Sequence, residues 1–352
     1  MKKQDIIDLI DAHVRGNDAS FIKKSYEIAQ GFYNSGEKEL ADYILSQLNP
    51  SLRIGTQTSE QNLSNSILFK EIESSSDSFI LPEVLSDQLK GIINAVSKNI
   101  GISKFLFVGL PGTGKTEAVR QLGRILHRTI YMINFDELID SRLGMTQKNL
   151  SALFDQMNRF PLPQRAIFLF DELDALALDR INSNDVREMG RVTSSLLKGL
   201  DQLNRNIMLI ATTNLQKNLD KAISRRFDAI INFNQYTNDD LFDVANDYLE
   251  GLIKKGIDIE KDSKLLKKII NNSYEQLTPG SLKNVLRTSV AFGDLNSKDY
   301  LRRLYLILKG DKVSKDNELY YLKEHNFSLR EMEILTLISR SELSRRLNIK
   351  DE

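Results

Sequence analysis

The chain has 352 residues, of which 41% are apolar and 27% charged, as in a globular protein with two or three domains. Its 48 basic and 48 acidic side chains balance, so no global field draws it to nucleic acid or membrane. The absence of cysteine excludes disulfides, thiolate catalysis and cysteine zinc sites. Neither a signal peptide nor a membrane-length apolar run is recognisable, and we expect a cytoplasmic protein without membrane contact.

The first fifty residues carry three short apolar stripes at helical spacing, from Ile6 to Val14, from Phe21 to Phe32 and from Leu40 to Leu48. We therefore expect a small helical bundle over residues 1–50 that serves as a partner or substrate domain. Residues 51–78 are rich in Ser, Gln, Asn and Glu, a composition that predicts a flexible linker.

From residue 79 onward, apolar runs alternate with helix-like sequence. This pattern predicts an α/β domain over residues 79–237, with a parallel sheet covered on both faces. Residues 238–309 read as entirely helical, and residues 310–352 as a charged helical module. The apolar runs are 105–109, 129–134, 166–170, 207–212 and 229–233.

A P-loop pattern, G-x-x-x-x-G-K-[ST], follows the first apolar run. Backbone N–H groups in such a loop, with the amino terminus of the next helix, attract phosphates. Lys115 would reach the β- and γ-phosphates of ATP, and the Thr116 hydroxyl would hold Mg²⁺. A chance glycine-rich turn is the alternative, which the completely filled pattern disfavours. The loop residues are Gly109, Leu110, Pro111, Gly112, Thr113, Gly114, Lys115 and Thr116.

Polar residues end two later apolar runs, where parallel sheets bind ligands. Asp171 would take the Mg²⁺, largely through water, and Glu172 would polarise the attacking water as a general base. The alternative is an acidic helix start after a strand. Asn214 would hydrogen-bond the γ-phosphate or position the water, although Asn is also common in strand-end turns.

The pair Arg225 and Arg226 precedes Phe227 and Asp228. A guanidinium stabilises charge on a departing γ-phosphate and can be supplied by a neighbouring subunit. A surface basic pair is the ordinary alternative.

Together these motifs resemble the AAA ATPases, and the Ser-Arg-Arg-Phe-Asp form is most similar to the katanin and spastin branch and to bacterial central-domain AAA ATPases. The resemblance covers residues 79–309. It implies a five-stranded αβα domain with a helical lid, assembled into a ring, usually a hexamer. It also implies a Mg²⁺-dependent ATP hydrolase that remodels or unfolds a protein, with Arg225 and Arg226 as arginine fingers acting between subunits. An isolated subunit should then hydrolyse ATP poorly.

Two positions depart from the family pattern. Arg142 stands where many unfoldases carry the aromatic residue of a pore loop that threads the substrate chain. Lys283 stands where some relatives have a sensor arginine, and it either substitutes for that arginine or has no role.

The C-terminal segment from Phe327 to Leu347 resembles a helix-turn-helix of the resolvase and repressor kind. Two residues depart from it: Glu333 would crowd the helix crossing, and Leu337 would strain a left-handed turn. The second helix would present residue types suited to DNA, namely Ser339, Arg340, Ser341, Arg345 and Arg346.

Three functional hypotheses follow. The leading one is a ring ATPase that remodels a protein. Its layout also resembles bacterial AAA proteins encoded beside subtilisin-like proteases in defence islands, which makes such a protease a candidate partner. The rival is a DNA-associated AAA ATPase in transposition, loading or defence. The third is a nucleotide-gated scaffold with slow turnover.

Overall fold

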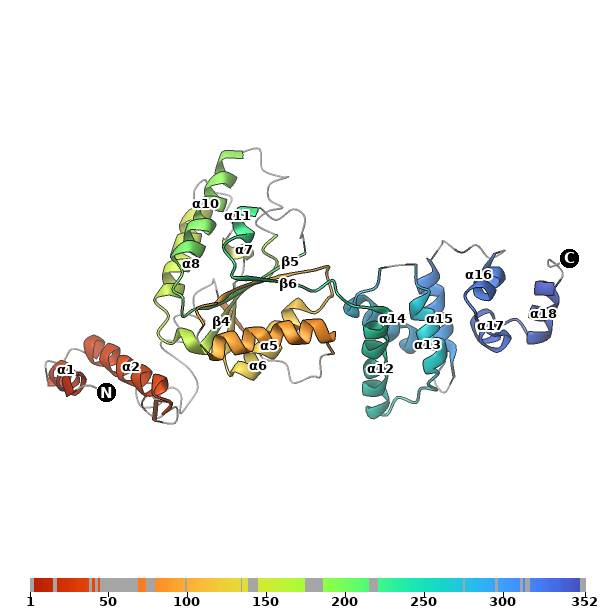
Figure 1. Ribbon diagram of the computed structural model, residues 1–352, viewed down its shortest axis with the longest axis horizontal. Coiled ribbons are helices and arrows are strands. Elements are labelled where there is room, and N and C mark those ends of the chain that lie inside the picture. The colour runs from red at the N-terminus through yellow and green to blue at the C-terminus, as the bar shows by residue number, and fades with distance from the viewer. Residues whose placement is uncertain are drawn as a thin grey trace.

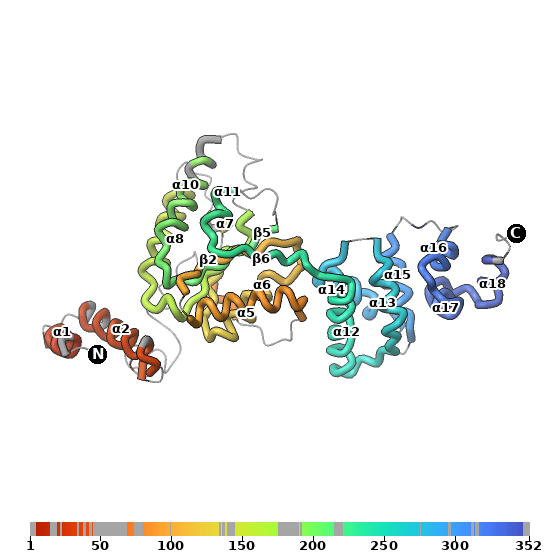
Figure 2. The backbone as a smooth tube through the Cα atoms, viewed as in Figure 1, coloured from red at the N-terminus to blue at the C-terminus, as the bar shows by residue number. Residues whose placement is uncertain are grey.

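The molecule consists of a helical pair, a helix-covered sheet and a run of further helices, in chain order (Figures 1 and 2). None of the helices in the described ranges is long and apolar enough to cross a membrane. The computed structural model describes residues 3–14, 18–37, 40–41, 44, 69–73, 80–98, 100–133, 135–138, 145–174, 186–214, 221–274, 276–294, 297–310, 313 and 317–348.

Six strands form one sheet in the order β1-β3-β4-β5-β2-β6. All neighbouring strands pair in parallel except β1, which is antiparallel to β3. Because the parallel strands share one direction, their carboxyl ends meet at one edge of the sheet. The strands are β1 Phe69–Ile72, β2 Lys104–Val108, β3 Thr129–Ile133, β4 Ala166–Phe170, β5 Met208–Thr213 and β6 Ala229–Asn232.

Helices cover both faces of the sheet, as the continuous apolar strands predict. Successive residues of a strand point to opposite faces, so Phe105 and Phe107 join the core beneath α5 and α6, while Leu106 and Val108 join the core beneath α8 and α10. The helices of this domain are α5 Glu83–Ser97, α6 Lys115–Leu126, α7 Phe135–Leu138, α8 Met145–Asn158, α10 Val186–Gln202 and α11 Lys221–Ser224, with a 3₁₀ turn at Pro163–Arg165.

Strand β1 corrects the expectation of a flexible linker over residues 51–78. Within that polar stretch, Phe69 is buried and its ring lies 5.7 Å from the ring of Phe168, edge to face. One buried aromatic and backbone pairing to β3 outweigh the polar composition, so the sheet gains a strand beyond the expected five. The rest of the predicted linker, apart from Glu73, lies outside the described residues.

The N-terminal unit contains two packed helices, α1 Lys3–Val14 and α2 Asp18–Asn34. Lys24 on α2 forms an ion pair with Asp8 on α1, at 3.2 Å between Nζ and Oδ2. Most of the third helix predicted here lies outside the described residues.

The helices after the sheet share a single apolar core. Buried residues from the lid, such as Leu266 and Leu304, lie in the same cluster as Leu335 and Leu347 near the C-terminal end. The lid helices are α12 Asn238–Lys254, α13 Ser263–Asn271, α14 Pro279–Ala291 and α15 Asp299–Lys309; α16 Glu318–Glu324, α17 Leu329–Thr336 and α18 Arg340–Asn348 follow.

The turn between α17 and α18 accommodates both residues that depart from the helix-turn-helix pattern. Leu337 adopts the left-handed conformation, with φ 60°, while its side chain is 69% exposed. Glu333 does not crowd the crossing as expected, because its carboxylate turns outward to an ion pair with Arg340 at 2.9 Å.

Candidate nucleotide-binding site

The predicted P-loop joins the carboxyl end of β2 to the start of α6. Gly112 and Gly114 have φ of 77° and 90°, a region that residues with a Cβ rarely adopt. A Cβ on Gly109 would lie 2.9 Å from Cβ of Phe233. The glycines of the pattern are therefore required by the backbone path of the loop.

Lys115 and Asn214, predicted from separate motifs, are in direct contact. The Lys115 Nζ donates to Asn214 Oδ1 at 2.8 Å and to the carbonyl oxygens of Gly109 and Leu110 at 2.7 and 3.0 Å. Burial lowers the pKa of Lys115, while the Asp171 carboxylate acts to raise it. A phosphate oxygen of a nucleotide would compete for these same lysine protons.

Thr116 and Asp171, the predicted magnesium ligands, also meet. The Thr116 hydroxyl donates to Asp171 Oδ1 at 3.1 Å. One carboxylate and one hydroxyl suit Mg²⁺, which keeps several waters and takes its other ligands from phosphates. Within the described ranges, no group of three or more His, Cys, Asp or Glu side chains could hold a metal by itself. The donor set thus fits a nucleotide-bound Mg²⁺ rather than a protein-caged ion.

Glu172, the predicted base, has an unusual backbone. Its φ is 53°, a left-handed conformation that costs a non-glycine residue about 1–2 kcal/mol. Its N–H donates to the Thr212 hydroxyl at 2.9 Å, and the next N–H, of Leu173, donates to the Thr212 carbonyl at 2.8 Å. Strain held in place by surrounding bonds is characteristic of functional positions. The carboxylate-bearing residue itself is exposed at the carboxyl edge of the sheet.

Thr212 is a further candidate site residue, which no motif in the sequence indicated. Its buried hydroxyl donates to Asp171 Oδ1 at 2.6 Å while accepting the N–H of Glu172. It therefore positions the predicted magnesium ligand and the predicted base together. The available signal was a hydroxyl residue at the end of an otherwise apolar strand, two residues before Asn214.

A small cavity of about 150 Å³ adjoins the P-loop and was also missed. Asn234 and Tyr236, from the segment between β6 and α12, fasten the loop: Asn234 Oδ1 accepts the N–H of Leu110 at 2.8 Å, and the Tyr236 hydroxyl donates to the Thr113 carbonyl at 3.2 Å. Ile270 and Leu277 of the lid complete the wall. Its mixed polar and apolar walls beside the phosphate loop suit a nucleotide base.

The lid touches the P-loop through two glycines. The N–H of Gly280, in the first turn of α14, donates to the Gly112 carbonyl at 2.8 Å. A Cβ on Gly280 would lie 2.9 Å from the Gly112 Cα. Lys283 lies three residues farther along α14 and is partly buried.

The two predicted finger arginines lie apart from this site. They precede β6, whose amino end pairs with Phe105 at the amino end of β2, whereas the P-loop leaves the carboxyl end of β2. The Arg226 side chain is held by two contacts: its Nε lies 3.2 Å from Asp201 Oδ1, and its Nη1 donates to the Ala222 carbonyl at 2.8 Å. Arg225 is exposed. Arg142, in the predicted pore loop, lies outside the described residues.

The same region matches a family model. The model, ATPase family associated with various cellular activities (AAA), matches residues 105–235. An AAA family ATPase of Sinorhizobium fredii is 40% identical over 133 residues, which are 38% of this chain and 39% of the relative. A putative 26S proteasome regulatory subunit homologue of Methanothermobacter thermautotrophicus is 26% identical over 285 residues, covering 76% of this chain and 74% of the relative.

Solved structures share the fold. The FIGL-1 AAA domain in complex with ADP has a TM-score of 0.53 at 17% identity, over 77% of this chain and 98% of that one. A chain of the Escherichia coli MS115-1 HORMA:CdnC:Trip13 complex has a TM-score of 0.54 at 17% identity, over 71% and 97%. With its P-loop, the contact between Thr116 and Asp171 and the matched family model, the region of residues 105–235 is an AAA ATPase domain, of a family whose cofactors are ATP and Mg²⁺.

Proposed function

We propose that the chain assembles into a hexameric ring and uses ATP hydrolysis to remodel or unfold a protein partner. The observation that carries this proposal is the position of Arg225. It is exposed at the amino edge of the sheet, while Lys115, Asp171 and Glu172 lie at the carboxyl edge.

Distance supports an action between subunits. The four residues of β6 span about 13 Å, and this length separates the arginine pair from the level of the P-loop. An arginine so placed is suited to the nucleotide of a neighbouring subunit rather than to that of its own. Arg226, held by Asp201, would fix the loop that presents Arg225.

The site chemistry supports turnover rather than binding alone. Lys115 and the loop N–H groups would hold the phosphates, and Thr116 with Asp171 would hold Mg²⁺, largely through water. Glu172 would take a proton from the attacking water, and Asn214, already 2.8 Å from Lys115 Nζ, would orient the γ-phosphate or that water. A scaffold that only binds nucleotide needs no strained and exposed carboxylate next to Asp171.

The N-terminal helix pair is our candidate for partner binding. Helix α1 exposes Ile7, Ile10 and Val14 along one side, with 77% of Val14 accessible. The relatives include a putative 26S proteasome regulatory subunit homologue and a vesicle-fusing ATPase of Arabidopsis thaliana, and the first of these names favours a protein partner. We further propose that the partner is a subtilisin-like protease, that the complex acts in defence and that the protein is cytoplasmic. These proposals rest on the order of the domains in the sequence.

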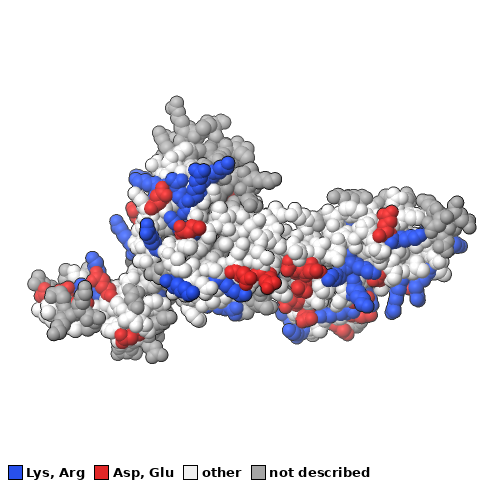
Figure 3. Space-filling model, viewed as in Figure 1, with Lys and Arg blue, Asp and Glu red and all other residues white. Residues whose placement is uncertain are grey.

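The DNA-associated alternative rests on α18. Its Arg345 and Arg346 are exposed, but both pair with Glu342 at 2.7 Å. Basic and acidic side chains are interspersed over the visible face of the molecule (Figure 3). A phosphate backbone would have to displace the glutamate from both arginines, which weakens this alternative.

A Glu172→Gln variant tests the proposal. Without the base, it should bind ATP, hydrolyse it poorly and form a stable ring, visible by sedimentation as a species of about six subunits. In an affinity pull-down with ATP it should retain a protein partner that raises wild-type ATPase activity. Unchanged turnover would remove Glu172 as the base. Stimulation by DNA that Arg345→Ala with Arg346→Ala abolishes would favour the alternative instead.

A further inference from the structure

A second cavity lies at the opposite edge of the sheet from the nucleotide site. Its volume is about 640 Å³, in the range of small-molecule sites. Several lining residues lie one or two positions before the start of a parallel strand, namely Ser103, Arg128, Gln164 and Asn206. Because the nucleotide residues follow those strands, a five-residue strand of about 17 Å separates the two sites.

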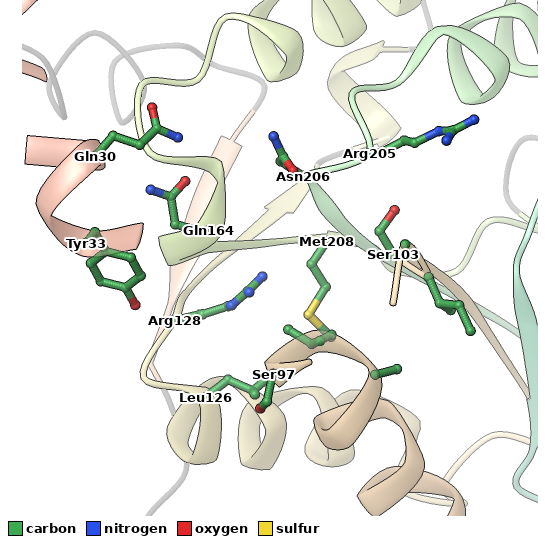
Figure 4. A pocket seen from close by; sticks show the side chains of 14 residues that line it. Gln30, Tyr33, Ser97, Ser103, Leu126, Arg128, Gln164, Arg205, Asn206 and Met208 are labelled. Carbon is green, nitrogen blue, oxygen red and sulfur yellow. The ribbon is translucent and has the colours of Figure 1, made fainter. Parts of the chain in front are cut away.

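Helix α2 of the N-terminal unit forms the other wall, through Gln30 and Tyr33 (Figure 4). The Arg165 guanidinium carbon lies 5.9 Å from the centre of the Tyr33 ring. The cavity is thus enclosed by two regions of the chain that are distant in sequence. Any ligand in it would touch both the N-terminal unit and the ATPase domain.

The charge in this cavity is positive. Among the described residues that line it, Arg128 and Arg205 are charged and none is acidic. The Asp228 carboxylate accepts the N–H groups of the lining residue Ser103 and of Lys104, both at 2.9 Å, but Asp228 is not among the described residues that line the cavity.

Two donors in the lining are candidates to bind a ligand. Figure 4 shows the Arg128 side chain extending into the middle of the lining group. Burial lowers the pKa of Arg128, while the Tyr33 hydroxyl acts to raise it. The Gln164 Nε2 is buried with no hydrogen-bond partner among the described residues. A partly desolvated guanidinium and an unpaired amide both cost free energy that an anionic oxygen would recover.

We propose that this cavity binds a small anion carrying carboxylate or phosphate oxygens, and that the bound anion fastens α2 to the ATPase domain. The Arg128 fork and the Gln164 amide are the primary contacts. This site does not depend on the proposed remodelling function, since it uses none of the nucleotide-binding residues.

The test uses the full chain with two background changes. Lys115→Ala removes phosphate binding at the P-loop. Tyr33→Trp places the only tryptophan of the chain in the cavity wall, because the natural sequence has none. Inorganic phosphate and citrate are titrated separately while the emission of that tryptophan is recorded, so that the two arms distinguish a phosphate from a carboxylate ligand.

We expect a saturable emission change with at least one probe. Adding Arg128→Gln should weaken that binding at least tenfold, while Arg287→Gln, a matched loss of charge on an exposed arginine of the lid, should leave it unchanged. If circular dichroism shows that Arg128→Gln does not fold, Gln164→Leu takes its place, with a several-fold weakening expected. The absence of saturable binding of either probe, or binding equally tight after removal of Arg128 or Gln164, would overturn the proposal.

Discussion

At the scale of residues, Asp171 accepts hydrogen bonds from two threonine hydroxyls, only one of which belongs to a recognisable motif. Thr116 is fixed by the P-loop pattern, whereas Thr212 is one of several strand residues whose side chain cannot be assigned from sequence. Local patterns predict Lys115, Asp171 and Glu172 as site residues, because the spacing within each motif follows from chemistry. Contacts across forty residues of chain, such as that of Thr212 with Glu172, follow from strand pairing and could not be predicted in this way.

Thr212→Val removes the hydroxyl and keeps the shape of the side chain. The Asp171 carboxylate and the strained Glu172 backbone would both lose a fixing bond, so we expect kcat to fall about 10- to 100-fold. Affinity for ATP should change little, because Lys115 and the loop are untouched. Steady-state ATPase assays with nucleotide titration measure both. Thr288→Val on the lid is the matched control, and equal kcat in the two variants would show that Thr212 has no positioning role.

At the scale of elements, the parallel strands and their helices could be predicted because long apolar runs determine them. Strand β1 could not, since its four residues, Phe-Lys-Glu-Ile, have no pattern beyond one aromatic. The lid helices were likewise predicted as a helical region, but their contact with the P-loop through Gly112 and Gly280 follows from tertiary packing alone.

Phe69→Ala should reveal how much β1 contributes to stability. Loss of a buried phenylalanine costs about 3 kcal/mol of unfolding free energy. Chemical denaturation should therefore show an earlier transition for the ATPase domain. Lys70→Ala, on the exposed side of the same strand, is the control and should unfold like the wild type. Identical midpoints for Phe69→Ala and Lys70→Ala would mean that β1 adds no stability.

Gly280→Ala tests the contact between the lid and the P-loop. The added Cβ would meet the Gly112 Cα at 2.9 Å, so α14 must move away from the loop. We expect the affinity for fluorescent ADP to fall about tenfold, or about 1.4 kcal/mol. Gly251→Ala in α12 adds a methyl group where no atom lies within 4 Å, and it should bind as the wild type does. Equal affinities in both variants would contradict a role of this contact in nucleotide binding.

At the scale of the whole molecule, the order of motifs predicted the family and the αβα core with its helical lid. We predicted a boundary between the lid and the C-terminal helices at residue 310. Leu304 and Leu347, one on each side of it, lie in one apolar cluster, and Lys268 of α13 pairs with Glu331 of α17 at 2.7 Å. The many charged residues of this segment gave no sign of the shared core. The ion pair of Arg226 with Asp201, which distinguishes Arg226 from the exposed Arg225, likewise depends on the tertiary fold and could not be predicted from the sequence.

The central claim is that Arg225 serves the nucleotide of a neighbouring subunit. Subunits with Glu172→Gln keep the finger and lack the base, while subunits with Arg225→Ala keep the base and lack the finger. Either variant alone should be nearly inactive. In an equal mixture, an Arg225→Ala subunit can receive the finger of a Glu172→Gln neighbour and complete its own site.

The most direct measurement is therefore the ATPase rate of that mixture, set against a control mixture of Glu172→Gln with Lys115→Ala, in which every site lacks either its base or its lysine. We predict that the first mixture exceeds the summed rates of its separate components, increasingly so at higher protein concentration, while the control mixture does not. A first mixture no faster than the sum of its components at any concentration would contradict action between subunits.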